Sequence, residues 1–172
     1  MAAVAVCLFA LLILSGCAGS LGSNPQTPNP GQPAATQRVA IVVLENKPYA
    51  EVIGSSSAPY MNQLAQQYGV ATEYFADTHP SIGNYFMMTT GQIVSNDDAF
   101  SGAVTSDNLA REITASGKKW KVYAQGLPGA GYSGGDQYPY LRHHNPFSYF
   151  SDVQGSSAQA NQMVPSAELS AD

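Results

Sequence analysis

Residues 38–48 read RVAIVVLENKP, and this stretch decides the fold class. The apolar, largely β-branched run from Arg38 to Leu44 predicts a strand buried on both faces, as in a parallel sheet. The polar segment Glu45 to Pro48 ends that strand abruptly. Helical spacing follows at 59–68 and 107–116, and further strands are predicted at 70–75 and 120–123. This alternation of strand and helix predicts an α/β fold.

Turn residues mark where the predicted helices begin and end. Pro59 suits the first turn of the helix over 59–68, and Gly69 suits its C-terminal cap. A short helix is predicted over 81–90 and ends at Gly91, and the helix over 107–116 ends at Gly117. The Gly-, Pro- and Tyr-rich segment 127–140 predicts an irregular loop.

The first 17 residues predict a lipoprotein signal peptide. Residues 1–15 read MAAVAVCLFALLILS, an apolar run too short to span a bilayer comfortably but suited to a signal-peptide core. Leu14-Ser15-Gly16-Cys17 then resembles the bacterial lipobox, which implies lipidation of Cys17. The alternatives are a plain signal peptide, or a buried helix with a chance cysteine. A basic residue near the start, usual in signal peptides, is not present.

Residues 18–37 predict a flexible tether between that anchor and a folded domain over 38–172. The segment holds four prolines and three glycines, and no charged or aromatic side chain. Lipid chains on Cys17 would hold such a domain at a membrane. We therefore expect an extracytoplasmic protein anchored to a bacterial membrane, in the periplasm or at the cell surface.

Charge is sparse and its balance is acidic. The 172 residues include 7 Lys and Arg and 12 Asp and Glu, for a net charge of −5, and the first 37 carry none of them. The sequence has no basic footprint, so nucleic-acid binding is not expected. Both cysteines, Cys7 and Cys17, lie near the N-terminus, which excludes a disulfide framework or a thiolate metal cluster in the body.

The first candidate site residues are Glu45 and Asn46. They follow the C-terminal end of the predicted buried strand, the edge at which open α/β sheets bind ligands. Their side-chain oxygens suit a hard or borderline cation. The alternative is that Asn46 before Lys47-Pro48 only forms a turn.

The second candidate is Ser81, within Thr78-His79-Pro80-Ser81-Ile82-Gly83-Asn84-Tyr85. Its hydroxyl would lie at the N-terminus of the predicted helix, where backbone N–H groups favour an anion. Asn84 follows one turn later, so its amide can reach the same side. The alternative is that Ser81 is only an N-cap and His79 a surface loop residue.

The third candidate is Arg142-His143-His144-Asn145-Pro146-Phe147. Histidine can act as an acid, a base or a metal ligand, and arginine suits phosphate. The alternative is a solvent-exposed basic patch on an acidic protein.

Taken in order over Arg38 to Val153, these motifs resemble the bacterial and fungal phosphoesterase family, which includes acid phosphatases and phospholipase C enzymes. Gly83 departs from the family pattern, because a proline often stands at that position. The motifs that carry the resemblance are ENKPYxxVIG, APYxNxLAxxYG, ATxYxAxTHPSxxNY, NLAxxIxxxGKKWKVYA and YxxxHNPFxYFxDV.

The resemblance implies an alkaline-phosphatase-like α/β fold, with a mostly parallel sheet flanked by helices, and a metal-assisted hydrolase with a hydroxyl nucleophile. By motif, Glu45 and Asn46 fall on metal ligands. Ser81 falls on the nucleophile, which would also contact the metal. Asn84 falls on the residue that holds the phosphoryl oxygen. His144 would reach the substrate phosphate or the leaving group, and Arg142 would assist in binding the phosphate.

The resemblance leaves several details open. It implies one divalent metal ion of unstated identity, and a small-molecule or lipid phosphate ester as substrate. It does not separate monoesters from diesters. The family's remaining acidic ligands are expected beyond position 172, so residues 38–172 are predicted to be the N-terminal portion of a phosphoesterase domain, incomplete at its C-terminus.

Two other functions compete with this interpretation. A lipid-anchored lipoprotein that binds a ligand without chemistry would fit the tether and the Tyr-rich loop equally well. A sulfatase on the same scaffold is disfavoured, because Ser81-Ile82-Gly83-Asn84-Tyr85 lacks the arginine that formylglycine formation requires.

Overall fold

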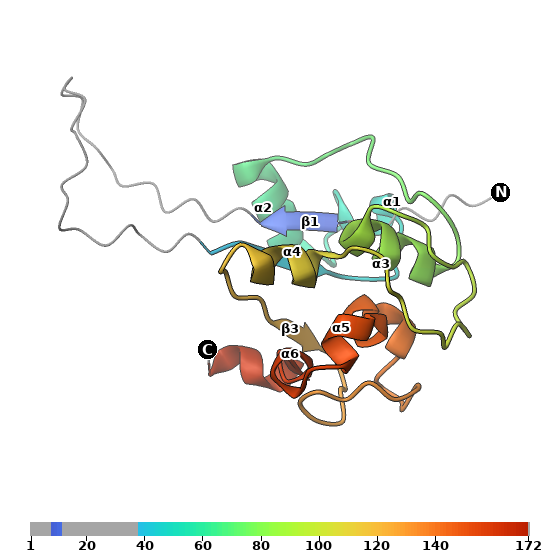
Figure 1. Cartoon of the computed structure of the whole chain (residues 1–172). Coiled ribbons are helices and arrows are strands. Elements are labelled where there is room, and N and C mark those ends of the chain that lie inside the picture. The colour runs from blue at the N-terminus through green and yellow to red at the C-terminus, as the bar shows by residue number, and fades with distance from the viewer. Residues whose placement is uncertain (1–7, 12–37, 172) are drawn as a thin grey trace, which may run out of the picture. The chain divides into compact units, whose positions relative to one another are not determined.

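The computed structural model describes residues 8–11 and 38–171, and the chain divides into two compact units (Figure 1). The first unit is Met1–Phe75 and the second is Ala76–Asp172. Cys17, the predicted lipidation site, and the predicted tether 18–37 lie outside the described residues. No helix within the described ranges has both the length and the apolar character needed to cross a bilayer.

The described residues of the first unit form a two-stranded antiparallel sheet and two helices. Leu8 pairs with Val43, and Leu11 pairs with Ala40 at the other end of the ladder. The elements are β1 (Leu8–Leu11), β2 (Ala40–Val43), α1 (Tyr49–Val52) and α2 (Pro59–Tyr68).

The prediction that 38–44 is a strand buried on both faces is wrong for this structure. Strand β2 forms at the expected place, but it pairs with β1 and the pairing is antiparallel. The side chains of Val39 and Ile41 are 71% and 56% exposed. Burial on both faces requires strands on both edges and helices on both faces, and β2 lies in a sheet of two strands.

The helix at 59–68 is confirmed, and the strand at 70–75 is not. Helix α2 has Pro59 at its first position, and the N–H of Gly69 (φ 108°) closes it on the Ala65 carbonyl. Residues 70–75 form a turn and irregular backbone, with Phe75 67% exposed. Alternation of apolar residues does not produce a strand without a neighbouring strand to bond to, and the described residues offer none there.

The second unit holds the remaining helices and a short parallel sheet (Figure 1, green to red). The predicted helix at 81–90 is confirmed with the same bounds, and the helix predicted at 107–116 forms over a shorter span. The elements are α3 (Ser81–Thr90), α4 (Leu109–Ala115), β3 (Val122–Ala124), η1 (Arg142–His144), η2 (Pro146–Tyr149), α5 (Ser151–Gln154), α6 (Ser157–Ala160), β4 (Met163–Pro165) and η3 (Ser166–Ser170).

The two strands of the second unit are parallel, which agrees with an α/β fold. Strand β3 pairs with β4 from Val122 with Met163 to Ala124 with Pro165. The predicted strand at 120–123 is thus present but shifted by two residues at its start. The segment 127–140 is irregular, as predicted. An alkaline-phosphatase-like sheet stays a prediction.

The core of the second unit is aromatic and surrounds α3. Phe86 is fully buried, and its ring meets the edges of Phe100 and Tyr149 at centroid distances of 5.9 and 5.4 Å. Burial raises the pKa of Tyr149 to about 12, although the nearby Arg142 guanidinium lowers it. Helix α3 packs against η1 and η2, so this core fixes the helix that begins at Ser81.

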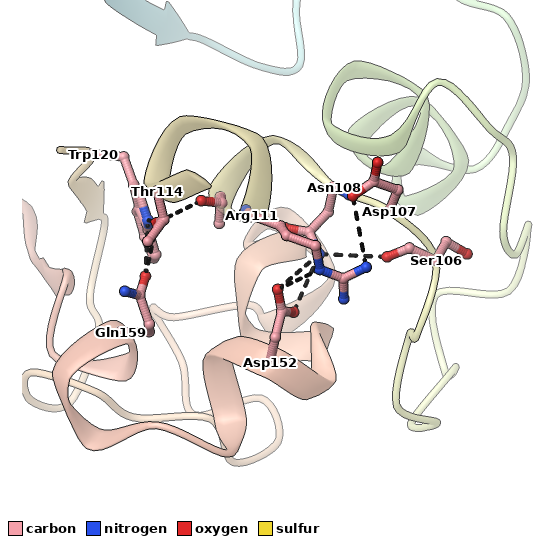
Figure 2. A network of polar contacts seen from close by, with 9 residues as sticks. Ser106, Asp107, Asn108, Arg111, Thr114, Trp120, Asp152 and Gln159 are labelled. Atoms are coloured by element: carbon pink, nitrogen blue, oxygen red, sulfur yellow. Dashed lines mark hydrogen bonds and ion pairs between the residues drawn. The ribbon is translucent and has the colours of Figure 1, made fainter. Parts of the chain in front are cut away.

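A polar network ties α4 to α5 (Figure 2). The Asp152 carboxylate accepts a hydrogen bond from Arg111 Nε at 3.1 Å and another from Asn108 Nδ2 at 3.1 Å. Asn108 is buried and also caps α4, because its Oδ1 accepts the Arg111 N–H at 3.0 Å. The Asp152 carboxylate of α5 therefore bonds both to Asn108, the buried N-cap of α4, and to Arg111 within α4.

The same figure shows a second polar link, between α4 and α6. Gln159 Oε1 accepts hydrogen bonds from Trp120 Nε1 at 3.0 Å and from Thr114 Oγ1 at 3.3 Å. The indole of Trp120 is otherwise buried and stacks on Phe147 at 5.0 Å. Its one polar atom is thus satisfied at the edge of the core.

We expect Asp152→Ala to lower the free energy of unfolding by about 1–3 kcal/mol, because it removes the carboxylate that accepts hydrogen bonds from the buried Asn108 amide and from Arg111. Urea denaturation followed by circular dichroism measures the change. Glu112→Ala is the control, since Glu112 is an exposed acid on α4, the helix that Asn108 caps, and should shift stability by at most about 0.5 kcal/mol. Equal losses in the two variants would contradict this role of Asp152.

Candidate active site

Ser81 is the first residue of α3, as predicted. The preceding Pro80 has an extended backbone (φ −76°, ψ −165°) and makes no side-chain cap. The next N–H, that of Ile82, donates to Asp98 Oδ1 at 3.2 Å. The N-terminus of this helix therefore already holds one anionic group, a carboxylate from a different loop.

Asn84 lies one turn after Ser81 and is 9% exposed. Its Oδ1 accepts the N–H groups of Asp77 and Thr78 at 2.9 and 3.2 Å, and its Nδ2 donates to the Thr78 carbonyl at 2.8 Å. These three bonds fasten the loop that leads into Ser81 onto the side of α3. Asn84 thus positions the backbone around Ser81, and a contact with phosphate stays a prediction.

Gly83 allows other segments to approach α3 closely. A Cβ at this position would overlap Asn96 Oδ1 and Thr78 Cγ2 and would lie 3.2 Å from the Ser95 carbonyl oxygen. The family's usual proline would meet the same atoms, so the departure noted in the sequence has a local cause here. The glycine lets loop 95–98 reach the N-terminal turn of the helix.

His144 packs onto the helix that carries Ser81. Its ring stacks on Tyr85 with a centroid distance of 5.4 Å and an angle of 29°. Tyr85 follows Ser81 by four residues, so both lie on one side of α3. The structure therefore brings Ser81, Asn84 and His144 to one helix and the turn that covers it.

Arg142 contacts the turn that follows it. Its Nη2 donates to the Ser148 carbonyl at 3.1 Å, and the guanidinium carbon lies 4.0 Å from the centroid of the Tyr149 ring. A cation over an aromatic face, with a carbonyl acceptor, is a stable packing arrangement. Binding of phosphate by Arg142 stays a prediction.

Asn145, which follows the two histidines, is a core residue. It is 1% exposed, and its Nδ2 donates to the Tyr140 hydroxyl at 3.3 Å. Its backbone carbonyl accepts from Ser148 Oγ at 2.7 Å. Asn145 therefore anchors η1 (Arg142–His144), which we call the histidine turn, in the core.

Glu45 and Asn46 lie in the first unit, just beyond the end of β2. Glu45 is half-buried and Asn46 is exposed. Their oxygen donors suit a divalent cation by chemistry. Within the residues that the structure describes, no three His, Cys, Asp or Glu side chains are grouped so that they could hold a metal ion.

Two acids that the sequence did not indicate contact the candidate residues. Asp98 binds the N-terminus of α3, and Asp136 lies beside His143, with Oδ2 3.7 Å from Nδ1. Neither acid has a fixed spacing from its partner, so no sequence signal marks it. The position of Tyr85 was predictable, because a residue four positions after Ser81 lies on the same face of the predicted helix.

A family model matches the part of the chain that holds Ser81 and His144. The model described as the Phosphoesterase family matches residues 54–172, more than half of the chain. The chain belongs to this family, which confirms the resemblance inferred from the sequence.

Three relatives agree with this assignment. The chain is 32% identical over 153 residues to a phosphatidylinositol-3-phosphatase of Mycobacterium tuberculosis, covering 87% of this chain and 51% of the relative. It is 30% identical over 111 residues to a phosphate-repressible acid phosphatase of Penicillium chrysogenum, covering 60% and 27%. It is 28% identical over 138 residues to an acid phosphatase of Aspergillus fumigatus, covering 75% and 30%.

The chain thus spans about half the length of the mycobacterial relative and less than a third of the two fungal ones. No solved structure matches it.

Proposed function

We propose that the protein containing this chain hydrolyses phosphate esters, with Ser81 as the nucleophile. The observation that carries the proposal is the packing of the His144 ring onto Tyr85, on the same side of the helix that begins at Ser81. A nucleophile and an acid–base group on packed elements are what ester cleavage through a covalent intermediate requires. Membership of the Phosphoesterase family supports the same chemistry.

The substrate class we propose is a small-molecule or lipid phosphate ester, as for an acid phosphatase or a phospholipase C. The relatives named phosphatidylinositol-3-phosphatase and phosphate-repressible acid phosphatase support this class. We further propose an extracytoplasmic location, with the protein held at a membrane through Cys17. An anchored enzyme would meet lipid head groups and free esters alike.

Each proposed residue has a separate task in the reaction. Ser81 Oγ releases its proton to solvent and attacks phosphorus, a bond from Oγ to phosphorus forms, and the bond from phosphorus to the leaving alcohol breaks. His144 gives that alcohol its proton. Water then attacks phosphorus, the bond from Oγ to phosphorus breaks, one proton of the water returns to Ser81 Oγ, and phosphate leaves; His144 regains its proton from solvent.

Stabilisation of the phosphoryl oxygens falls to Asn84 and Arg142. The Asn84 amide has a second hydrogen besides the one it gives to Thr78, and this hydrogen would hold a phosphoryl oxygen. The Ile82 N–H is bonded to Asp98, so we do not assign it to the substrate. Arg142 would supply positive charge beside the histidine turn.

The donor chemistry of Glu45, Asn46 and Ser81 fits a divalent metal ion, and these residues would hold it. Carboxylate, carboxamide and hydroxyl oxygens are ligands for hard and borderline cations. When bound, such an ion lowers the pKa of a coordinated hydroxyl and neutralises phosphoryl charge.

A chromogenic phosphate ester assay on the full-length protein tests the proposal. We expect turnover that a chelator abolishes and added divalent metal restores, and we expect Glu45→Ala to reproduce the chelated state with a loss of about 100-fold or more. Glu51→Ala is the control, because Glu51 is an exposed acid in the same unit, paired with Lys47 at 3.1 Å.

Two results would contradict the proposal. Turnover that no chelator reduces would remove the metal ion from it. Binding of the ester without any release of phosphate would favour the anchored binding protein instead.

A further inference from the structure

Asp136 contacts two consecutive residues at the start of the histidine turn η1. Its Oδ1 accepts the backbone N–H of Arg142 at 2.7 Å. Its other oxygen, Oδ2, lies 3.7 Å from Nδ1 of His143. One carboxylate therefore lies against both the backbone and the first imidazole of η1.

The Nδ1 atom of His143 is buried and makes no hydrogen bond to any described residue. The side chain as a whole is only 14% exposed. The polar atom that faces Nδ1 is thus a carboxylate oxygen just beyond hydrogen-bond distance. A lone pair on Nδ1 would repel that oxygen, whereas an N–H there would be attracted to it.

We propose that Asp136 is a positioning residue that holds the hydrogen of His143 on Nδ1 and leaves the lone pair on Nε2. The two ring nitrogens of a histidine are distinct, and the partner of one decides the chemistry of the other. Asp136 thereby fixes which edge of the imidazole offers a lone pair to its surroundings.

The orientation of His143 bears directly on His144. The two rings meet edge to face, with centroids 4.4 Å apart and an angle of 80°. His144 in turn stacks on Tyr85 of α3. Without the carboxylate, the His143 ring can turn over about its own axis and change the edge that it presents to His144. The effect of Asp136 on turnover rests on the proposed function, whereas the tautomer of His143 does not.

Nitrogen NMR of the 172-residue chain tests the tautomer directly. The sequence has three histidines, so His79→Gln and His144→Gln variants assign the His143 signals. At a pH where the rings are neutral, we expect His143 to show a hydrogen on Nδ1 and a lone pair on Nε2. The opposite tautomer in the wild-type chain would overturn the proposal without any variant.

Asp136→Asn is the matched variant, because its amide oxygen can still accept the Arg142 N–H while the charge is lost. We expect the His143 spectrum of this variant to shift towards the other tautomer. Asp97→Asn is the control, since Asp97 Oδ1 also accepts a backbone N–H, that of Ala99 at 2.9 Å, from an exposed position. An unchanged tautomer in Asp136→Asn would overturn the proposal.

Kinetics on the full-length protein test the consequence for turnover. We expect Asp136→Asn to lower kcat by about 10- to 100-fold, by analogy with the loss of a hydrogen-bond partner of a metal-bound histidine, and to change KM little. Asp97→Asn should leave both constants unchanged. An unchanged kcat in Asp136→Asn would overturn the positioning role. A wild-type protein without turnover would instead overturn the proposed function, and the NMR result would still decide the tautomer.

Discussion

Ser81→Ala in the full-length protein is expected to lower kcat by on the order of 10³-fold or more, as when a covalent nucleophile is removed. The variant lacks the oxygen that would attack phosphorus, so hydrolysis through a phosphoserine is lost. Alanine has high helix propensity, and α3 should still begin at the same place. Release of a chromogenic leaving group measures the effect.

Ser116→Ala is the matched control for this prediction. Ser116 lies at the C-terminal end of α4, is exposed, and donates to the Ile113 carbonyl at 2.7 Å. Its loss should leave kcat unchanged. Mass spectrometry of the wild-type protein quenched during turnover should show one added phosphoryl group on Ser81. Near-wild-type turnover by Ser81→Ala would refute the assignment of the nucleophile.

Phe86→Ala should lower the free energy of unfolding by about 3–5 kcal/mol. Phe86 is fully buried, and its ring meets both Phe100 and Tyr149, so truncation opens a cavity under α3. A typical domain has about 5–15 kcal/mol of stability in total, so this single change removes a large share. Chemical denaturation measures the loss.

Phe75→Ala serves as the control, because it deletes the same side chain where 67% of the residue is exposed. Its effect should stay within about 0.5 kcal/mol. Equal losses in the two variants would mean that the aromatic cluster around α3 does not stabilise the fold.

The helices that position the site were predictable from local chemistry. Helix α3 begins after Pro80 and ends at Gly91, which adopts the left-handed conformation (φ 70°) that glycine favours. Proline and glycine signals of this kind act within one or two residues, so they can be read from a single sequence. The same holds for α2 and its two ends.

The environment of the strands was not predictable in the same way. The run from Arg38 to Leu44 predicted a buried strand, and the strand that forms has exposed side chains. Burial depends on which other segments pack against a strand, and local sequence contains no information about those partners. The predicted strand at 70–75 failed for the same reason.

The candidate site was predictable as a set of residues and not as a geometry. The sequence indicated Ser81, Asn84 and His144, and the structure places them on α3 and the turn packed against it. The bonds from Asn84 to loop 77–78 and from Asp98 to α3 depend on how loops return to the helix. Such contacts join residues with no regular spacing.

The crowding around Gly83 has a consequence for protein engineering. Helix α3 has ten residues. It carries the proposed nucleophile Ser81, Asn84, which bonds to loop 77–78, Tyr85, which stacks on His144, and the buried Phe86. Gly83, in the same helix, tolerates no larger side chain unless Asn96 and Thr78 are displaced. A random library should therefore recover few viable substitutions along this helix.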